Sequence, residues 1–84
     1  MTKQEFLDGK WFKLNSDSSF VYRCNNNGSS ITEGIIMSNG NIVSQTYQGV
    51  IEKITPTRFK GYGYVISKRV NFKFKFEDLI LTEM

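Results

Sequence analysis

The chain has 84 residues, a net charge of +3, one cysteine and no histidine. A domain of this length buries only about 60–65% of its unfolded surface, which supports one modest core and leaves little room for a deep active site. The lack of histidine removes the commonest general base and metal ligand, and the lone Cys24 can form neither an internal disulfide nor a zinc site. We therefore expect a single domain over residues 1–84 that is not an enzyme and takes no metal or cofactor.

A short helix is predicted at the N-terminus. Within Thr2–Asp8 (TKQEFLD), Thr2 can cap the first turn, Glu5 completes a capping box, and Gly9 ends the helix. No segment after Gly9 shows a helical period, so we expect the rest of the chain to be β-structure.

Short strands separated by turns follow the helix. Trp11–Leu14 and Ser19–Cys24 have the composition of strands, and the polar residues 15–18 (NSDS) between them favour a turn. A loop over residues 25–29 then leads to a third strand over residues 31–37.

The fourth strand is long and is predicted to bend. Asn39-Gly40 before it predicts a hairpin with a type I′ turn. Within Ile42–Ile54 the apolar residues fall on both faces of a straight strand, so we expect a bulge near Gly49 that helps the sheet to curl. The two sets are Val43, Tyr47 and Ile51 on one face, and Ile42, Val50 and Ile54 on the other.

The segment Arg58–Glu77 (RFKGYGYVISKRVNFKFKFE) predicts a β-hairpin with two chemically different faces, because strand side chains alternate. With Lys68-Arg69 as a two-residue turn, Val65 lies opposite Phe72. The apolar face then consists of Phe59, Val65, Val70, Phe72, Phe74 and Phe76. The other face is basic and tyrosine-rich, and consists of Arg58, Lys60, Tyr62, Tyr64, Lys73 and Lys75.

The remaining features complete the expected fold. Gly61 and Gly63 lie on the apolar face of the hairpin, where we expect Phe76 and Phe74 to cover them. Residues 78–82 add a last apolar segment. Short strands and tight turns together predict an all-β domain, a small antiparallel meander of five to seven strands that forms a closed or half-open barrel, with a short N-terminal helix.

The sequence KGYGYV, Lys60–Val65, resembles the RNP1 signature that RNA-recognition motifs and cold-shock domains share in loose form. The resemblance implies that Tyr62 and Tyr64 stack on bases while the glycines let the strand approach closely. Residues 10–12 (KWF) are similar to the first strand of cold-shock domains but lie far upstream, and the segment after Leu14 cannot form the first helix of an RNA-recognition motif. The resemblance therefore covers two short pieces and transfers a mode of contact rather than a family.

Gly9-Lys10-Trp11 after a short helix resembles the G-x-W opening of lipocalin-like barrels. The chain is about half the length that such a barrel needs, so the resemblance implies an internal pocket only if chains associate. Trp11 is more simply explained as a core residue at the bottom of a small barrel.

The chain could be a structural part of a larger assembly, for which the sequence offers no discriminating sign, and three interpretations of the basic face itself remain open. The first is binding of single-stranded RNA or DNA, with the tyrosines stacking on bases at about 1–3 kcal/mol each and with Arg58, Lys60, Lys73 and Lys75 on phosphates. The second is ordinary sheet construction, in which cross-strand Tyr–Lys pairs contribute about 0.2–1 kcal/mol each. The third is a small protein-interaction or inhibitor module that binds a partner protein or self-associates as a homo-oligomer, since tyrosine, arginine and open sheet edges are common at interfaces.

The composition also suggests a source and a location. Its richness in lysine, asparagine and isoleucine would suit a compact, AT-rich genome such as that of a phage. The sequence shows neither the pattern of a signal peptide nor an apolar stretch of membrane-spanning length, so we expect a cytoplasmic protein that does not contact membranes.

Overall fold

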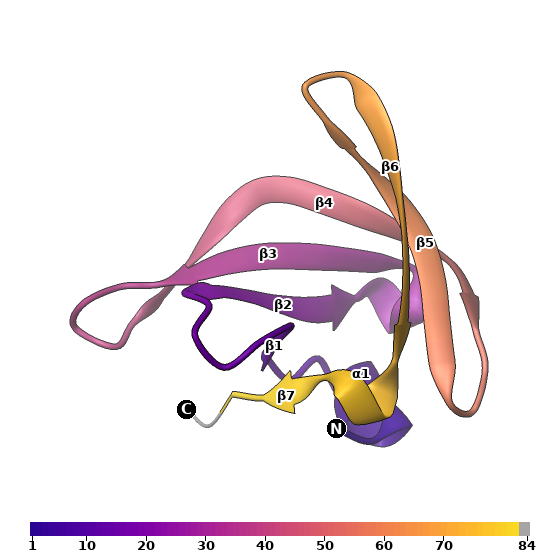
Figure 1. Ribbon diagram of the computed structural model, residues 1–84, viewed down its shortest axis with the longest axis horizontal. Coiled ribbons are helices and arrows are strands. Elements are labelled where there is room, and N and C mark those ends of the chain that lie inside the picture. The colour runs from indigo at the N-terminus through magenta and orange to yellow at the C-terminus, as the bar shows by residue number, and fades with distance from the viewer. Residues whose placement is uncertain (83–84) are drawn as a thin grey trace.

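The computed structural model describes residues 1–82, with Asn26 and residues 45–48 described by their backbone alone. Its strands form one antiparallel sheet in the order β6-β5-β4-β3-β2-β1-β7, which curls into a half-barrel (Figure 1). This confirms the predicted all-β half-open barrel with a short N-terminal helix. The elements are α1 (Lys3–Leu7), β1 (Phe12–Lys13), β2 (Phe20–Asn25), η1 (Asn26–Gly28), β3 (Ser30–Ile36), β4 (Ile42–Ile54), β5 (Arg58–Val65), β6 (Lys68–Lys75), η2 (Phe76–Asp78) and β7 (Ile80–Leu81).

Helix α1 begins at its predicted capping box. The Thr2 hydroxyl accepts a hydrogen bond from the Glu5 N–H at 3.1 Å, and the Glu5 carboxylate accepts one from the Thr2 N–H at 2.8 Å. Gly9 follows with a φ of 78°, in the left-handed region that ends a helix. The cap fixes the start of α1 and so directs Phe6 into the core, where its side chain is fully buried.

The turn between β3 and β4 differs from its prediction. The Met37 N–H donates to the Asn41 carbonyl at 2.7 Å, and the Gly40 N–H donates to the Met37 carbonyl at 2.9 Å. Of the turn residues, Gly40 has a positive φ (87°) and Asn39 does not, so the predicted type I′ turn is wrong. The hairpin closes instead with a three-residue loop that ends in a left-handed glycine.

Strand β4 is irregular near Gly49, as predicted. Its register with β3 shifts between Ser44 and Gln48, and its register with β5 shifts at Glu52. The two irregularities flank Gly49, and β4 follows a curved path (Figure 1). Tyr47 was predicted to share a face of this strand with Val43 and Ile51, but its side chain lies outside the described part of the structure.

The β5–β6 hairpin keeps its predicted faces but not its predicted register. Ile66 and Ser67 form the turn, with φ of 50° and 64°, so Lys68-Arg69 is not the turn and Val65 lies opposite Lys68. Each β5 residue has a partner four positions earlier in β6 than predicted. Because four is even, every side chain stays on its predicted face.

The change of register alters which rings cover the glycines. Gly61 pairs with Phe72, whose ring lies over it, rather than with Phe76. Gly63 pairs with Val70 rather than with Phe74. The idea that aromatic rings cover bare backbone is therefore confirmed for Gly61, with a different partner.

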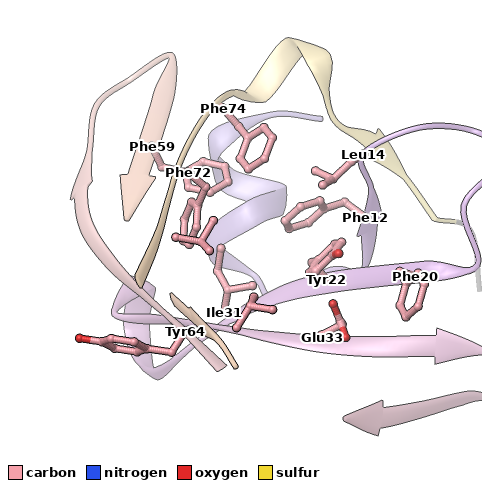
Figure 2. A pocket seen from close by; sticks show the side chains of 12 residues that line it. Phe12, Leu14, Phe20, Tyr22, Ile31, Glu33, Phe59, Tyr64, Phe72 and Phe74 are labelled. Carbon is pink, nitrogen blue, oxygen red and sulfur yellow. The ribbon is translucent and has the colours of Figure 1, made fainter. Parts of the chain in front are cut away.

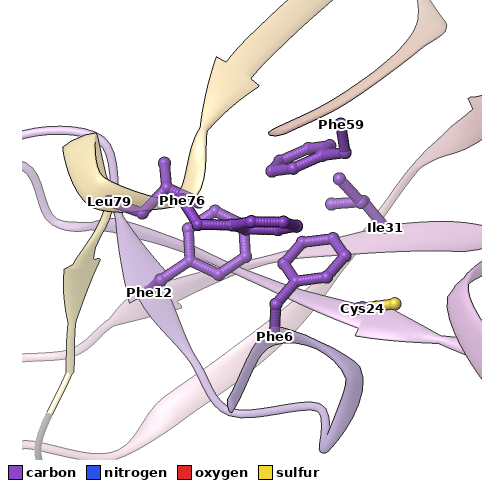
Figure 3. Close-up of a cluster of buried hydrophobic side chains, with 7 residues drawn as sticks. All are labelled: Phe6, Phe12, Cys24, Ile31, Phe59, Phe76 and Leu79. Atoms are coloured by element: carbon purple, nitrogen blue, oxygen red, sulfur yellow. The ribbon is translucent and has the colours of Figure 1, made fainter. Parts of the chain in front are cut away.

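The core lies at the α1 end of the concave side of the sheet (Figure 3). Phe6 rises from the helix and stacks on Phe59 of β5 at a ring-centroid distance of 4.5 Å. Burying each such ring contributes roughly 1.5–3 kcal/mol. The cluster consists of Phe6, Phe12, Cys24, Ile31, Phe59, Phe76 and Leu79.

The C-terminal segment closes this end of the half-barrel. After η2, strand β7 pairs with β1, so that β6 and β7 form the two ends of the sheet. The Met1 ammonium donates to the carbonyls of Phe76 and Leu79 at 3.1 and 2.9 Å and ties the N-terminus to η2. In the described part of the chain, no comparable segment covers the rest of the concave side.

Trp11 does not occupy the bottom of the barrel. Its ring packs against Gly34 on the convex side, and the Arg23 guanidinium lies 5.1 Å from the ring centroid. A β-carbon at Gly34 would come within 3.0 Å of the indole, so the glycine provides the space that the ring fills. The expected core position of Trp11 is therefore wrong.

Candidate functional site

The convex face of β4, β5 and β6 carries five exposed basic side chains, which we call the basic rows. Lys60 lies between Lys53 and Lys73 in the cross-strand register, and the next row pairs Arg58 with Lys75. Adjacent strands are about 4.8 Å apart, so each row sets like charges side by side, which disfavours strand pairing. Within the described part of the chain, none of the five forms a salt bridge.

Two tyrosines lie beside the basic rows, in different environments. Tyr64 is 58% exposed, whereas Tyr62 is half-buried. The Arg69 guanidinium lies 4.0 Å from the centroid of the Tyr62 ring and 3.6 Å from the Glu52 carboxylate. One face of the Tyr62 ring is therefore occupied by a cation, and Tyr64 offers the freer ring.

The two tyrosine rings are close but perpendicular. Their centroids are 6.0 Å apart and their planes make an angle of 87°. Two successive bases in a parallel stack could not lie flat on both rings without a change of rotamer. The site as it stands therefore offers one stacking surface at Tyr64 and a second one, made by the Arg69 guanidinium, over Tyr62.

All six residues predicted from sequence lie on this one face. The structure adds Lys53 and Arg69, which the sequence argument missed. Lys53 joins the face because the irregularity at Glu52 resets the alternation of β4, and Arg69 joins it because the turn lies earlier than expected. The row of Lys53, Lys60 and Lys73 could have been predicted from sequence only if the position of the bulge in β4 had been known.

The concave side holds an apolar pocket of about 530 Å³ that borders the core at Phe12, Ile31 and Phe59 and is open beyond them (Figure 2). Its volume lies in the range of small-molecule and peptide side-chain sites, roughly 300–1,000 Å³. The lining consists of Phe12, Leu14, Phe20, Tyr22, Ile31, Glu33, Phe59, Tyr64, Val65, Val70, Phe72 and Phe74. The predicted apolar face is thus core near α1 and open elsewhere: Val65 and Val70 are 51% and 45% exposed rather than buried.

Of the residues that the structure describes, Glu33 is the one charged residue in the lining of this pocket. It lies opposite Tyr22 in the register of β2 and β3, and Figure 2 shows it among the aromatic side chains, whereas Tyr64 points outward at the rim. Among the described residues Glu33 forms no salt bridge. A cationic side chain that entered the pocket would therefore meet an acidic group there.

The described residues offer little for catalysis. Burial raises the pKa of the Cys24 thiol, which lowers its thiolate fraction and its reactivity. Within residues 1–82 no group of three or more acidic, cysteine or histidine side chains could hold a metal ion. No helix in this part of the chain is both long and apolar enough to cross a membrane.

Comparison of the chain with protein-family models, curated proteins and solved structures gives no match. The chemistry of the two faces of the sheet is therefore the basis for a functional assignment.

Proposed function

We propose that this protein is a non-enzymatic module that binds single-stranded nucleic acid on its convex face. The observation that supports this best is the pair of basic rows beside the exposed ring of Tyr64. Side-by-side lysines oppose folding slightly, and they lack acidic partners in the described chain. A polyanionic ligand would supply the missing negative charge.

In this proposal the ligand backbone follows the basic rows and a base stacks on Tyr64. The five cations contact phosphates, and stacking on the tyrosine contributes about 1–3 kcal/mol. Neither contact reads the edge of a base, so many sequences would bind. Arg69 over Tyr62 provides a second planar surface for a neighbouring base.

Fluorescence anisotropy with short labelled single strands at low salt tests the proposal. Five phosphate contacts predict that the logarithm of the association constant falls with the logarithm of salt concentration with a slope of about −3.5. Absence of binding at tens of micromolar protein in low salt would refute the proposal.

Two pairs of variants separate this function from ordinary sheet construction. Tyr64→Ala should weaken binding by about 5- to 150-fold, while Tyr64→Phe keeps the ring and should bind like the unaltered protein. Lys60→Ala combined with Lys73→Ala should reduce the magnitude of the salt slope by about 1.4. Lys10→Ala removes an exposed cation outside the basic rows and should reduce the affinity much less. If all these variants bind alike, the face is structural only.

A further inference from the structure

We propose that two copies of this chain associate through their concave sides, with the β5–β6 turn of one copy in the apolar pocket of the other. In this contact Ile66 enters the pocket and Lys68 lies beside Glu33. The contact uses the side of the sheet opposite the basic rows. It shares only Tyr64, at the rim of the pocket, with the proposed nucleic-acid site.

The exposure and backbone conformation of Ile66, in the β5–β6 turn, have no structural benefit in a single copy of the chain. Ile66 is 93% exposed, the highest exposure among the large apolar side chains of the described chain. Its φ is 50°, a conformation that is costly for a β-branched residue and that asparagine or glycine adopts easily. In a single copy Ile66 therefore costs conformational energy and buries almost no apolar surface.

The arm that presents Ile66 extends beyond the rest of the sheet. β4 pairs with β5 only as far as Tyr62, so the residues from Gly63 to Val70 form a two-stranded arm (Figure 1). A two-stranded ribbon without a further neighbour is only marginally stable in water. Contact with a second molecule would supply the missing packing.

The pocket matches the turn in chemistry. The turn offers an aliphatic side chain with a lysine two residues away, and the pocket offers aromatic and aliphatic walls with one carboxylate. Lys68 lies opposite Val65, a residue of the pocket wall, so its side chain is on the concave side of the hairpin. Lys68 and Glu33 are thus complementary charges on the same side of the sheet.

The turn cannot occupy the pocket of its own chain. Val65 and Val70 flank the turn and are themselves part of the pocket wall. A second copy avoids this constraint, and a two-fold axis lets each turn enter the other pocket so that the assembly closes at a dimer. Edge pairing through β6 is a poorer route, because Arg69, Lys73 and Lys75 would bring like charges together.

Sedimentation velocity of the full chain without nucleic acid, over a wide range of protein concentration, tests the association. The unaltered protein should shift from monomer to dimer, and Ile66→Asn should weaken the dimer at least about tenfold. Asparagine suits the positive φ, so at concentrations where the unaltered protein is monomeric the same variant should melt at an equal or higher temperature. A monomer at all concentrations, or a dimer that Ile66→Asn leaves unchanged, would overturn the proposal.

A charge exchange tests the register of the contact. Glu33→Lys and Lys68→Glu should each weaken the dimer, and the double variant should restore it. Met37→Asn is the matched control, because Met37 is 46% exposed beside the other hairpin turn and lies outside the pocket. Equal loss with Met37→Asn, or no recovery in the double variant, would contradict the assigned contact. Ile66→Asn should still bind single strands, so this proposal and the proposed function can fail separately.

Discussion

Gly61 joins the basic face to the packing beneath it, and its substitution by alanine is the sharpest test of the fold. A β-carbon at Gly61 would clash with the Val50 carbonyl oxygen and would lie 2.8 Å from the ring of Phe72. The ring can rotate away, but the carbonyl belongs to the backbone of β4. Gly61→Ala must therefore push β4 and β5 apart where Lys60 and Tyr62 are positioned.

The size of the effect follows from two opposing terms. Overpacking that moves backbone costs roughly 3 kcal/mol, at the upper end of such substitutions. The loss of glycine freedom in the unfolded chain returns roughly 0.4–1 kcal/mol. The net loss of about 2 kcal/mol is large for a chain of this length, whose total stability is about 4–13 kcal/mol.

Thermal unfolding followed by circular dichroism measures this loss. A change of about 2 kcal/mol should lower the melting temperature by about 8–16 °C. Gly40→Ala is the control, because it has a positive φ of 87° but no atom within 4 Å of the added carbon, and it should cost only about 1 kcal/mol. If Gly61→Ala melts at or above the temperature of Gly40→Ala, the close packing of β4 against β5 is refuted.

Three further predictions concern the core and the termini. Phe6→Ala removes the ring that stacks on Phe59 and should cost about 3–5 kcal/mol, which urea unfolding would show as loss of most of the stability. Thr2→Ala removes the helix cap and should cost about 1 kcal/mol. A hydrogen bond from the Thr2 backbone lowers the pKa of Glu5, so the Glu5 carboxylate stabilises the fold above pH 4–5. Urea titrations at decreasing pH should show that the stabilisation from Glu5 fades on acidification. Burial raises the pKa of Cys24, so the unfolded thiol ionises first and stability should fall as pH rises above about 8.5. Cys24→Ala should lack that fall, and identical alkaline profiles for both proteins would contradict it.

The faces of the hairpin could be predicted from sequence because alternation depends only on parity. Phe59 and Phe72 turned inward, and Lys60 and Tyr64 turned outward, although the register was misplaced by four residues. The register was missed because the turn falls on Ile66-Ser67, where a β-branched residue adopts a positive φ against its usual preference. The usual residue preferences of tight turns therefore could not predict a turn at Ile66-Ser67.

The open pocket could not be predicted because it depends on long-range closure. Phe72 and Val70 lie on the same face of the hairpin as Phe59, and the sequence alone assigns all three to the core. The positions of α1 and η2 and the pairing of β7 with β1 together decide which end of the concave side is filled. The position of Trp11 could not be predicted for the same reason, because its ring packs on Gly34, which lies in a strand distant in sequence.

The distribution of charge along β6 explains why contacts should be made by the faces rather than by the edge. As the end strand of the sheet, β6 has backbone groups that no other strand pairs with. Lys73 and Lys75 alternate with Phe72 and Phe74, so a strand added to this edge would meet the full charge of the basic rows on one side. A polyanion is attracted by the charges that repel such a strand. The alternation of lysine and phenylalanine in β6 thus disfavours pairing at the edge and places cations on the convex face. It also leaves aromatic surface on the concave face, where a second molecule can bind.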